Sequence, residues 1–236
     1  MNLNNNEKLN EIIKGSLGII TYLFFNFIFT SVMVSFGLNI ENLTQKQKIF
    51  ISMFISFIVL FILILISKKK LIENFKDYKK NWKVLLKRNA KYWFCALGVM
   101  FMANLMISLI FNRLTSANDQ NVRDIFNIAP IYIIFEAAIL APFTEELVFR
   151  QSIRYLCKNK YVFIILSGLI FGFMHTLASL ESLSDFLYII PYSVPGFFFA
   201  YMLYKEDNVL VPISFHTIHN SMALILLIIS KLMGIM

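Results

Sequence analysis

Three groups of ionisable or amide side chains lie in otherwise apolar stretches, where they could carry chemistry: Glu145, Glu146 and Arg150 in APFTEELVFR, His175 in SGLIFGFMH, and His216, His219 and Asn220 in VPISFHTIHNS. Carboxylates and imidazoles are common general acids and bases, and imidazole and amide groups can stabilise developing negative charge. A charge at the centre of a membrane helix costs about 2.5–3.5 kcal/mol, so such residues usually face a bundle interior and pair there. We therefore expect the three groups to meet.

The first group contains an ion pair and a second carboxylate. On a helix with about 100° per residue, Glu146 and Arg150 are four positions apart and nearly stacked, whereas Glu145 points about 100° away from Glu146. Glu145 is then left without a cation of its own. Pro142 removes a backbone hydrogen bond one turn earlier and is expected to kink or open the helix beside it. These features make Glu145 the candidate general base.

The second group sits on a helix suited to close packing. His175 shares a face with Phe171, four residues earlier. Gly168 and Gly172 form a small-xxx-small spacing, which lets a neighbouring helix approach closely.

In the third group, His216 and Asn220 are four residues apart and project together, and Pro212 is placed to begin their helix. Counted from the predicted cytoplasmic ends of their helices at about 1.5 Å per residue, Glu145, His175 and His216 lie about 10–22 Å into the membrane. Their depths in the membrane are similar enough for the three side chains to share one chamber.

Each group has a simpler interpretation as well. A single buried histidine, or the Glu146 and Arg150 pair alone, more often serves packing than catalysis. His219 lies about 60° from His216 around the helix, so it could either lie beside the site or form a hydrogen bond to another helix. Glu136 and Asp185 are interpreted as structural.

The composition indicates a membrane protein. Hydrophobic residues make up 58% of the 236 residues and charged residues 15%, against about 45–50% and about 25% in soluble domains. The net charge is +8, but the basic residues lie mainly between apolar runs, as expected for contact with lipid headgroups rather than nucleic acid. The two cysteines, Cys95 and Cys157, have no ligand spacing, which argues against a disulfide or a zinc cluster.

The fold class predicted is an all-α, polytopic transmembrane helical bundle with a C-terminal four-helix catalytic core. The N-terminus lacks a signal-peptide pattern, so its first apolar run is interpreted as a retained span. Apolar runs of about 20 residues predict about seven spans: 13–37, 49–67, 92–111, 128–149, 161–179, 185–204 and 209–231. The predicted regions are 1–127, with the N-terminal helices and a basic loop, and 128–236, with the catalytic core.

The orientation follows from residues 68–91, which hold ten of the 22 basic residues and two acids. The positive-inside rule places this segment in the cytoplasm, with the N-terminus inside and the C-terminus outside a cell membrane. The loop 112–124 and the turn with Glu181 and Asp185 then lie outside. Residues 71–87 are expected to form an amphipathic helix along the membrane surface.

Other intramembrane proteases leave signatures that are absent here. The chain has no H-E-x-x-H zinc motif and no G-x-G-D aspartyl motif, and Ser167 lacks the glycine two residues earlier that a rhomboid-like G-x-S-G requires. These classes are excluded.

Taken in order, Glu145-Glu146-x-x-x-Arg150, Phe171-x-x-x-His175 and His216-x-x-x-Asn220 resemble the CAAX protease and bacteriocin-processing family, also called Abi. Each motif is weak alone, but the ordered set within about 75 residues is much more specific. The resemblance covers roughly residues 128–232.

The resemblance implies a protein that cleaves peptide bonds in a chamber inside the bilayer, usually open toward the cytoplasm. Glu145 with His175 would orient and deprotonate water, and His216 with Asn220 would donate hydrogen bonds to the oxyanion. Glu146 and Arg150 match the remaining motif positions and are expected to fix the first helix, with a direct role for Glu146 left open.

The resemblance also bears on cofactor and substrate. Because Asn is a poor zinc ligand, we favour no metal, with a divalent metal such as zinc as the alternative. The expected partners are the lipid bilayer and a peptide or membrane-protein substrate. Nucleic acid is not expected as a partner, and the sequence does not indicate an oligomeric state. Composition suggests a low-GC bacterial member, for which peptide maturation or bacteriocin-related processing is expected.

Two rival functions stay open at this stage. One is a non-proteolytic membrane protein for bacteriocin immunity or sensor regulation that keeps the polar cluster for helix packing. A transporter has less support, because the sequence shows no inverted repeat and no paired broken helices.

Overall fold

The computed structural model describes residues 4–37, 39, 41–112, 115–177, 180 and 183–234, with the backbone alone at 26 and 183. Its regular elements are all helical, and the described residues contain no strand. In chain order the elements are α1 (Asn5–Ser35), α2 (Gln45–Phe111), α3 (Ala117–Ile128), α4 (Pro130–Phe135), η1 (Glu136–Leu140), α5 (Ala141–Glu145), η2 (Glu146–Ser152), α6 (Ile153–Leu156), α7 (Lys160–Leu177), η3 (Leu183–Tyr188), α8 (Ile189–Glu206) and α9 (Leu210–Leu232). Here η1 and η2 are π-helical and η3 is a 3₁₀ helix.

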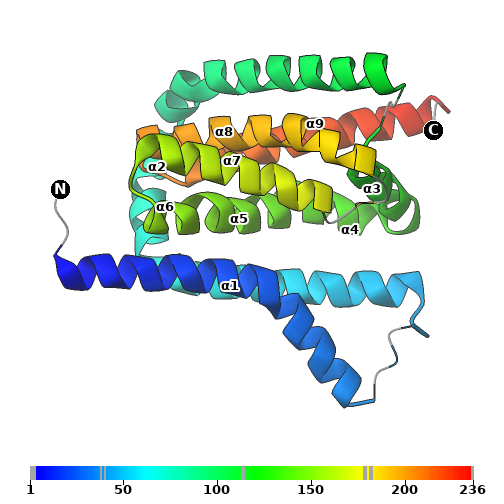
Figure 1. The fold of residues 1–236 in the computed structure, drawn as a ribbon, viewed down its shortest axis with the longest axis horizontal. Coiled ribbons are helices and arrows are strands. Elements are labelled where there is room, and N and C mark those ends of the chain that lie inside the picture. Colours follow the sequence, from blue (N-terminus) through cyan, green and yellow to red (C-terminus); the bar gives the residue numbers. More distant parts are fainter. Residues whose placement is uncertain are drawn as a thin grey trace.

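The long helix α2 surrounds the C-terminal helices. It runs along one side of the bundle next to α1, crosses the end that carries the N-terminus, and returns along the opposite side (Figure 1). The run from α4 to α6, with α7, α8 and α9, lies between its two arms (Figure 1). Helix α1 begins and helix α9 ends at opposite ends of the bundle (Figure 1).

The chain is a helical membrane bundle. Four of its described helices are long and apolar enough to cross a membrane, or five if α1 is counted with its bend of 45°. The difference from the seven predicted spans has two sources. The continuous helix α2 contains both predicted spans 49–67 and 92–111, and the predicted span 128–149 is divided among short α-helical and π-helical segments.

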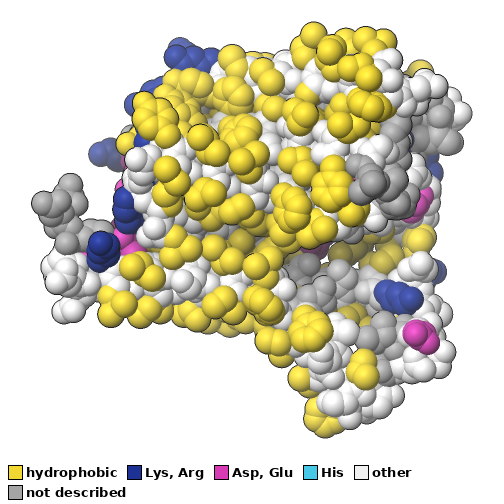
Figure 2. Space-filling model, in the orientation of Figure 1, with side chains coloured by type: hydrophobic (Ala, Val, Ile, Leu, Met, Phe, Trp, Pro, Cys, Tyr) yellow, Lys and Arg dark blue, Asp and Glu magenta, His cyan; other side chains and the backbone are white. Residues whose placement is uncertain are grey.

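The basic segment 68–91 is helical throughout and forms the part of α2 that crosses the end of the bundle. Most of the Lys and Arg side chains visible in Figure 2 gather at this end, whereas hydrophobic side chains cover the middle of that face. This separation is the one expected of a protein whose middle faces lipid and whose basic end faces headgroups.

A set of hydrogen bonds, which we call the polar clamp, joins this segment to the turn between α8 and α9. Its residues are Asn74, Asp77, Asp207, Asn208 and Val209. The Asn74 amide donates to the Asp207 carbonyl (3.1 Å) and its oxygen accepts from the Val209 N–H (2.9 Å). The Asn208 amide donates to the Asn74 carbonyl and to the Asp77 carboxylate, both at 2.9 Å. Asn74 and Asn208 are buried, so the clamp satisfies polar groups that would otherwise destabilise the fold.

Helices α7 and α8 approach closely through small residues, as the spacing of Gly168 and Gly172 predicts. A Cβ atom on Gly196 would lie 2.8 Å from the Gly168 Cα, and one on Gly172 would lie 2.2 Å from the Ser193 Oγ. Neither position has room for a larger side chain. The close approach fixes the helix that carries His175 against α8.

The N-terminal helices contribute to the same core as the C-terminal ones. Ile55 and Val59 of α2 pack in one buried hydrophobic cluster with Leu147 of η2 and Ile213 of α9. Helix α1 also packs against η2, where a Cβ on Gly18 would meet the Ser152 side chain. Residues upstream of 128 therefore help to position the candidate site.

The predicted loop 112–124 contains a helix that the apolar runs do not reveal. Helix α3 begins after Ser116, whose side chain accepts a hydrogen bond from the Asp119 N–H, and it buries Phe126 against α4 and α9. In the predicted turn further along the chain, Asp185 is buried in η3, while Glu181 lies outside the described residues.

Candidate active site

The helix that carries the glutamates is opened by Pro142, as expected. In η1 the Ala141 N–H donates to the carbonyl of Glu136, five residues back, instead of four. Continued by one residue, this pattern would pair the Ala137 carbonyl with residue 142, but proline has no N–H. The Asn220 side chain of α9 takes that place and donates to the Ala137 carbonyl at 2.8 Å.

Glu145 meets both predicted histidines. Its Oε2 lies 3.7 Å from the Nε2 of His175 on α7 and 3.7 Å from the Nε2 of His216 on α9. The three side chains are 14%, 21% and 5% exposed, respectively. A carboxylate oxygen thus lies between two imidazole nitrogens in a largely dehydrated setting.

The ring of His175 is oriented by its own helix and by α8. Its Nδ1 is 3.0 Å from the Phe171 carbonyl, which can only accept, so Nδ1 carries the hydrogen. The opposite nitrogen, Nε2, faces Glu145. The rings of Phe171 and Tyr192 lie on His175, with centroids at 4.2 and 5.3 Å. These contacts fix both the tautomer and the plane of the ring.

Glu146 is the centre of a buried charge network. Its Oε2 lies 3.1 Å from the Arg150 Nε, which is the ion pair that the sequence predicts, and both side chains are 0% exposed. Its Oε1 accepts a hydrogen bond from the His216 Nδ1 at 2.8 Å, a contact that the spacing does not reveal. The Arg150 guanidinium also lies 4.1 Å from the centroid of the Phe171 ring. Glu146 therefore holds a site histidine as well as its own helix.

Five of the six predicted residues form one connected group: Glu145, Glu146, Arg150, His175 and His216. The sixth, Asn220, has its amide nitrogen on the Ala137 carbonyl. His219 is half-buried, and its Nδ1 has no hydrogen-bond partner among the described residues.

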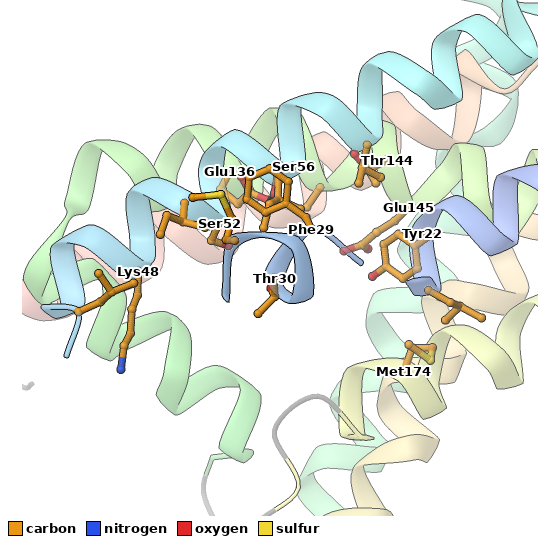
Figure 3. A pocket seen from close by; sticks show the side chains of 17 residues that line it. Tyr22, Phe29, Thr30, Lys48, Ser52, Ser56, Glu136, Thr144, Glu145 and Met174 are labelled. Carbon is orange, nitrogen blue, oxygen red and sulfur yellow. Dashed lines mark hydrogen bonds between the residues drawn. The ribbon is translucent and has the colours of Figure 1, made fainter. Parts of the chain in front are cut away.

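A cleft of about 450 Å³ reaches this group from the side of α1. Tyr22 and Glu145 lie together in it, with Met174 opposite, while Glu136 and Ser56 lie farther along (Figure 3). It continues to Lys48, near the turn between α1 and α2, and so runs away from the basic end of the bundle. The resemblance instead implies a chamber open toward the basic, cytoplasmic end.

Sequence reasoning missed two residues of this cleft. The sequence predicts a structural role for Glu136, whereas in the structure it lines the cleft that Glu145 faces. Tyr22 carries a hydroxyl in a run of Phe, Leu and Ile, which is the signal that could have drawn attention to it. Its ring packs edge-on against Phe149, with centroids 5.2 Å apart, so α1 contributes a wall of the candidate site.

The donor set does not fit a zinc site. Among the described residues, no group of three or more His, Cys, Asp or Glu side chains is placed to hold a metal ion. Glu146 is engaged by Arg150 and His216, and the Nδ1 of His175 by a backbone carbonyl. A buried guanidinium beside these groups also repels a cation.

Comparisons with known proteins agree with the family resemblance of the motif residues. The family described as "Type II CAAX prenyl endopeptidase Rce1-like" matches residues 127–222. An uncharacterized protein of Mycoplasma capricolum subsp. capricolum is 30% identical over 168 residues, covering 66% of this chain and 48% of that protein. YdiL of Bacillus subtilis, named as a candidate membrane peptidase, is 29% identical over 114 residues, covering 47% and 43%.

A third relative, the UPF0177 protein YxdF of Lactococcus lactis subsp. lactis, is 29% identical over 146 residues, covering 54% of this chain and 76% of that protein. This chain matches about half or less of the length of the first two relatives. No solved structure matches it. All the motif residues fall inside the segment 127–222, and the resemblance is thereby confirmed: this is a membrane protein with an Rce1-like segment, consistent with the CAAX protease and bacteriocin-processing family.

Proposed function

We propose that the protein is an intramembrane endopeptidase that hydrolyses a peptide or membrane-protein substrate in the cleft at Glu145. The observation that carries the proposal is the position of the Glu145 carboxylate at the cleft wall, 3.7 Å from the Nε2 atoms of both His175 and His216. This arrangement supplies a base for water and a hydrogen-bond donor for an oxyanion within one small volume.

The two ring nitrogens of His216 have different partners. Its Nδ1 donates to the Oε1 of Glu146, and its Nε2 lies 3.7 Å from the Oε2 of Glu145. With a hydrogen on both nitrogens, Nε2 is a donor, as an oxyanion partner must be.

In the reaction, one water hydrogen is bound by the His175 Nε2 and the other is taken by Glu145. The water oxygen attacks the peptide carbonyl carbon, and the carbonyl electrons move to the oxygen, which accepts a hydrogen bond from the His216 Nε2. Collapse of the tetrahedral intermediate breaks the C–N bond. The proton on Glu145 passes to the leaving amine, which regenerates the carboxylate.

Asn220 is proposed as the second donor to the oxyanion. Its amide nitrogen carries two hydrogens, so the bond to the Ala137 carbonyl leaves one for this role. Each donor of this kind is commonly worth about 10²–10³ in rate.

Biologically, we propose peptide maturation or bacteriocin-related processing in a cell membrane, with the basic end of the bundle in the cytoplasm. The support for this orientation is the gathering of Lys and Arg in residues 68–91. The division into a supporting region 1–127 and a catalytic region 128–236 belongs to the same proposal.

The test compares the peptides of membranes that contain the wild-type protein, Glu145→Ala, His175→Ala or His216→Ala, with membrane abundance measured for each. All three variants should lose the same cleavage products at wild-type abundance. Glu73→Ala on the exposed face of α2 is the matched control and should retain them. Full cleavage by Glu145→Ala would overturn the assignment.

A further inference from the structure

Glu136 is a carboxylate in the cleft for which the proposed reaction has no use. It lines the same cleft as Glu145, on the side away from the basic end (Figure 3). Its Oε1 accepts a hydrogen bond from the Ser56 hydroxyl at 3.0 Å. Its other oxygen, Oε2, is buried and has no hydrogen-bond partner among the described residues.

No described Lys, Arg or His forms an ion pair with Glu136. Lys48 lines the same cleft, but it lies at the far end with its ammonium group turned away from Glu136 (Figure 3). A carboxylate inside the membrane normally finds a cation, because its solitary burial costs about 2.5–3.5 kcal/mol. Here the cleft itself is the route by which a cation can reach it.

We infer that Glu136 is a specificity-determining residue, which binds a cationic side chain of the substrate, lysine or arginine, while the scissile bond lies at Glu145. This inference rests on the proposed peptidase function. Ser56 holds Oε1, which leaves Oε2 as the acceptor for the incoming group. A charge-assisted hydrogen bond from the substrate then satisfies the buried oxygen.

The helix geometry gives the distance between the subsite and the scissile bond. Glu136 and Glu145 are nine residues apart, which is at most roughly 13 Å at the α-helical rise of about 1.5 Å per residue, because the first turn between them is π-helical and more tightly spaced along the axis. An extended peptide advances about 3.3 Å per residue, so this separation spans about four substrate residues. The preferred basic residue should therefore lie three to five positions from the cleaved bond, on one side of it only.

The test uses purified full-length protein in liposomes and a positional set of quenched fluorescent peptides. At each position from five before to five after the cleaved bond, lysine is compared with norleucine, which keeps the four side-chain carbons and lacks the ammonium group. For the wild type, lysine should raise kcat/KM by roughly ten- to a hundredfold at one position in the expected range. Wild-type cleavage without a preference for lysine at any such position would overturn the inference while leaving the peptidase function intact.

Variants then assign the preference to its residue. In Glu136→Gln the ratio of lysine to norleucine cleavage should fall to about one, and in Ser56→Ala it should fall partway, because the carboxylate loses the bond that orients it. Glu73→Gln, the same change on an exposed face of α2, should keep the wild-type ratio. A full lysine preference in Glu136→Gln would overturn the inference. Absence of any Glu145-dependent cleavage by the wild type would remove the proposed function and this inference with it.

Discussion

The Oε1 of Glu146 lies 2.8 Å from the Nδ1 of His216, across 70 positions of sequence. The opposite nitrogen of the same ring faces Glu145. Two adjacent glutamates therefore face the two nitrogens of one imidazole, and Glu146 forms a hydrogen bond to it. Glu146 thus fixes the ring from one side, while Glu145 remains at the cleft.

Replacing Glu146 with glutamine should separate these two roles. The amide keeps the size of the side chain but removes the charged acceptor that holds the His216 Nδ1–H. We expect kcat to fall by about 10²–10³, with a much smaller change in KM, because the His216 donor that loses its position acts on the oxyanion rather than on bound substrate. Steady-state kinetics in liposomes measure both constants. A selective rise in KM would contradict this role for Glu146.

Replacing Pro142 with alanine supplies an N–H where the helix has none. The new donor competes with Asn220 for the Ala137 carbonyl, so α9 loses a tether near His216. We expect cleavage to fall about tenfold, roughly 1.4 kcal/mol in activation free energy. The effects of Pro142→Ala and Asn220→Ala should not add in the double variant, because both act on one carbonyl. A double-mutant cycle based on kcat/KM measures the coupling between the two positions. If the two effects were additive, the proposed competition for the Ala137 carbonyl would be wrong.

The close contact of α7 and α8 predicts a strong response at Gly196. In Gly196→Ala the new Cβ would lie 2.8 Å from the Gly168 Cα, and neither backbone can yield without moving its helix. We expect a loss of about 1–3 kcal/mol in unfolding free energy and reduced cleavage, since α7 carries His175. Gly98→Ala is the control, because no atom lies within 4 Å of its added Cβ. Thermal unfolding in detergent should leave this control at or above the wild-type Tm, and equal Tm values for the two variants would contradict the packing argument.

The polar clamp predicts a loss of stability without a change in chemistry. Asn208→Ala removes the donor to the Asn74 carbonyl and to the Asp77 carboxylate. Asn74 is buried, whereas Asp77 is exposed, so the loss of the bond to Asn74 should account for most of a cost of about 1–3 kcal/mol. Tm should therefore fall while cleavage per folded molecule is retained. Asn104→Ala is the control, because Asn104 is exposed on α2 and its amide donates to the Met100 carbonyl of the same helix; this change should have little effect. A Tm equal to that of the wild type would show that the clamp is not stabilising.

Contacts set by short spacing along one helix could be predicted from the sequence. The Glu146 and Arg150 pair follows from four-residue spacing, and the close approach of α7 follows from Gly168 and Gly172. The membrane class follows from composition, because a chain with so little charge cannot solvate its surface.

Contacts that depend on how helices are rotated against one another could not be predicted. A helical wheel assumes about 100° per residue, whereas η1 and η2 are π-helical, which changes the facing of every later side chain. The bonds from His216 to Glu146 and from Asn220 to Ala137 join segments 70 and 83 positions apart. The positions of Glu136 and Tyr22 in the cleft could not be predicted either, because the cleft forms only when α1 and α2 pack against the later helices.

The polar clamp has a consequence for how the chain is made. Residues of α2 leave the ribosome long before the turn between α8 and α9, so the acceptors at Asn74 and Asp77 are in place when that turn emerges. The last two helices can then dock against a surface that the chain has already built. The position of His216 along the bundle is thereby set by Asn74 and Asp77, which are synthesised much earlier.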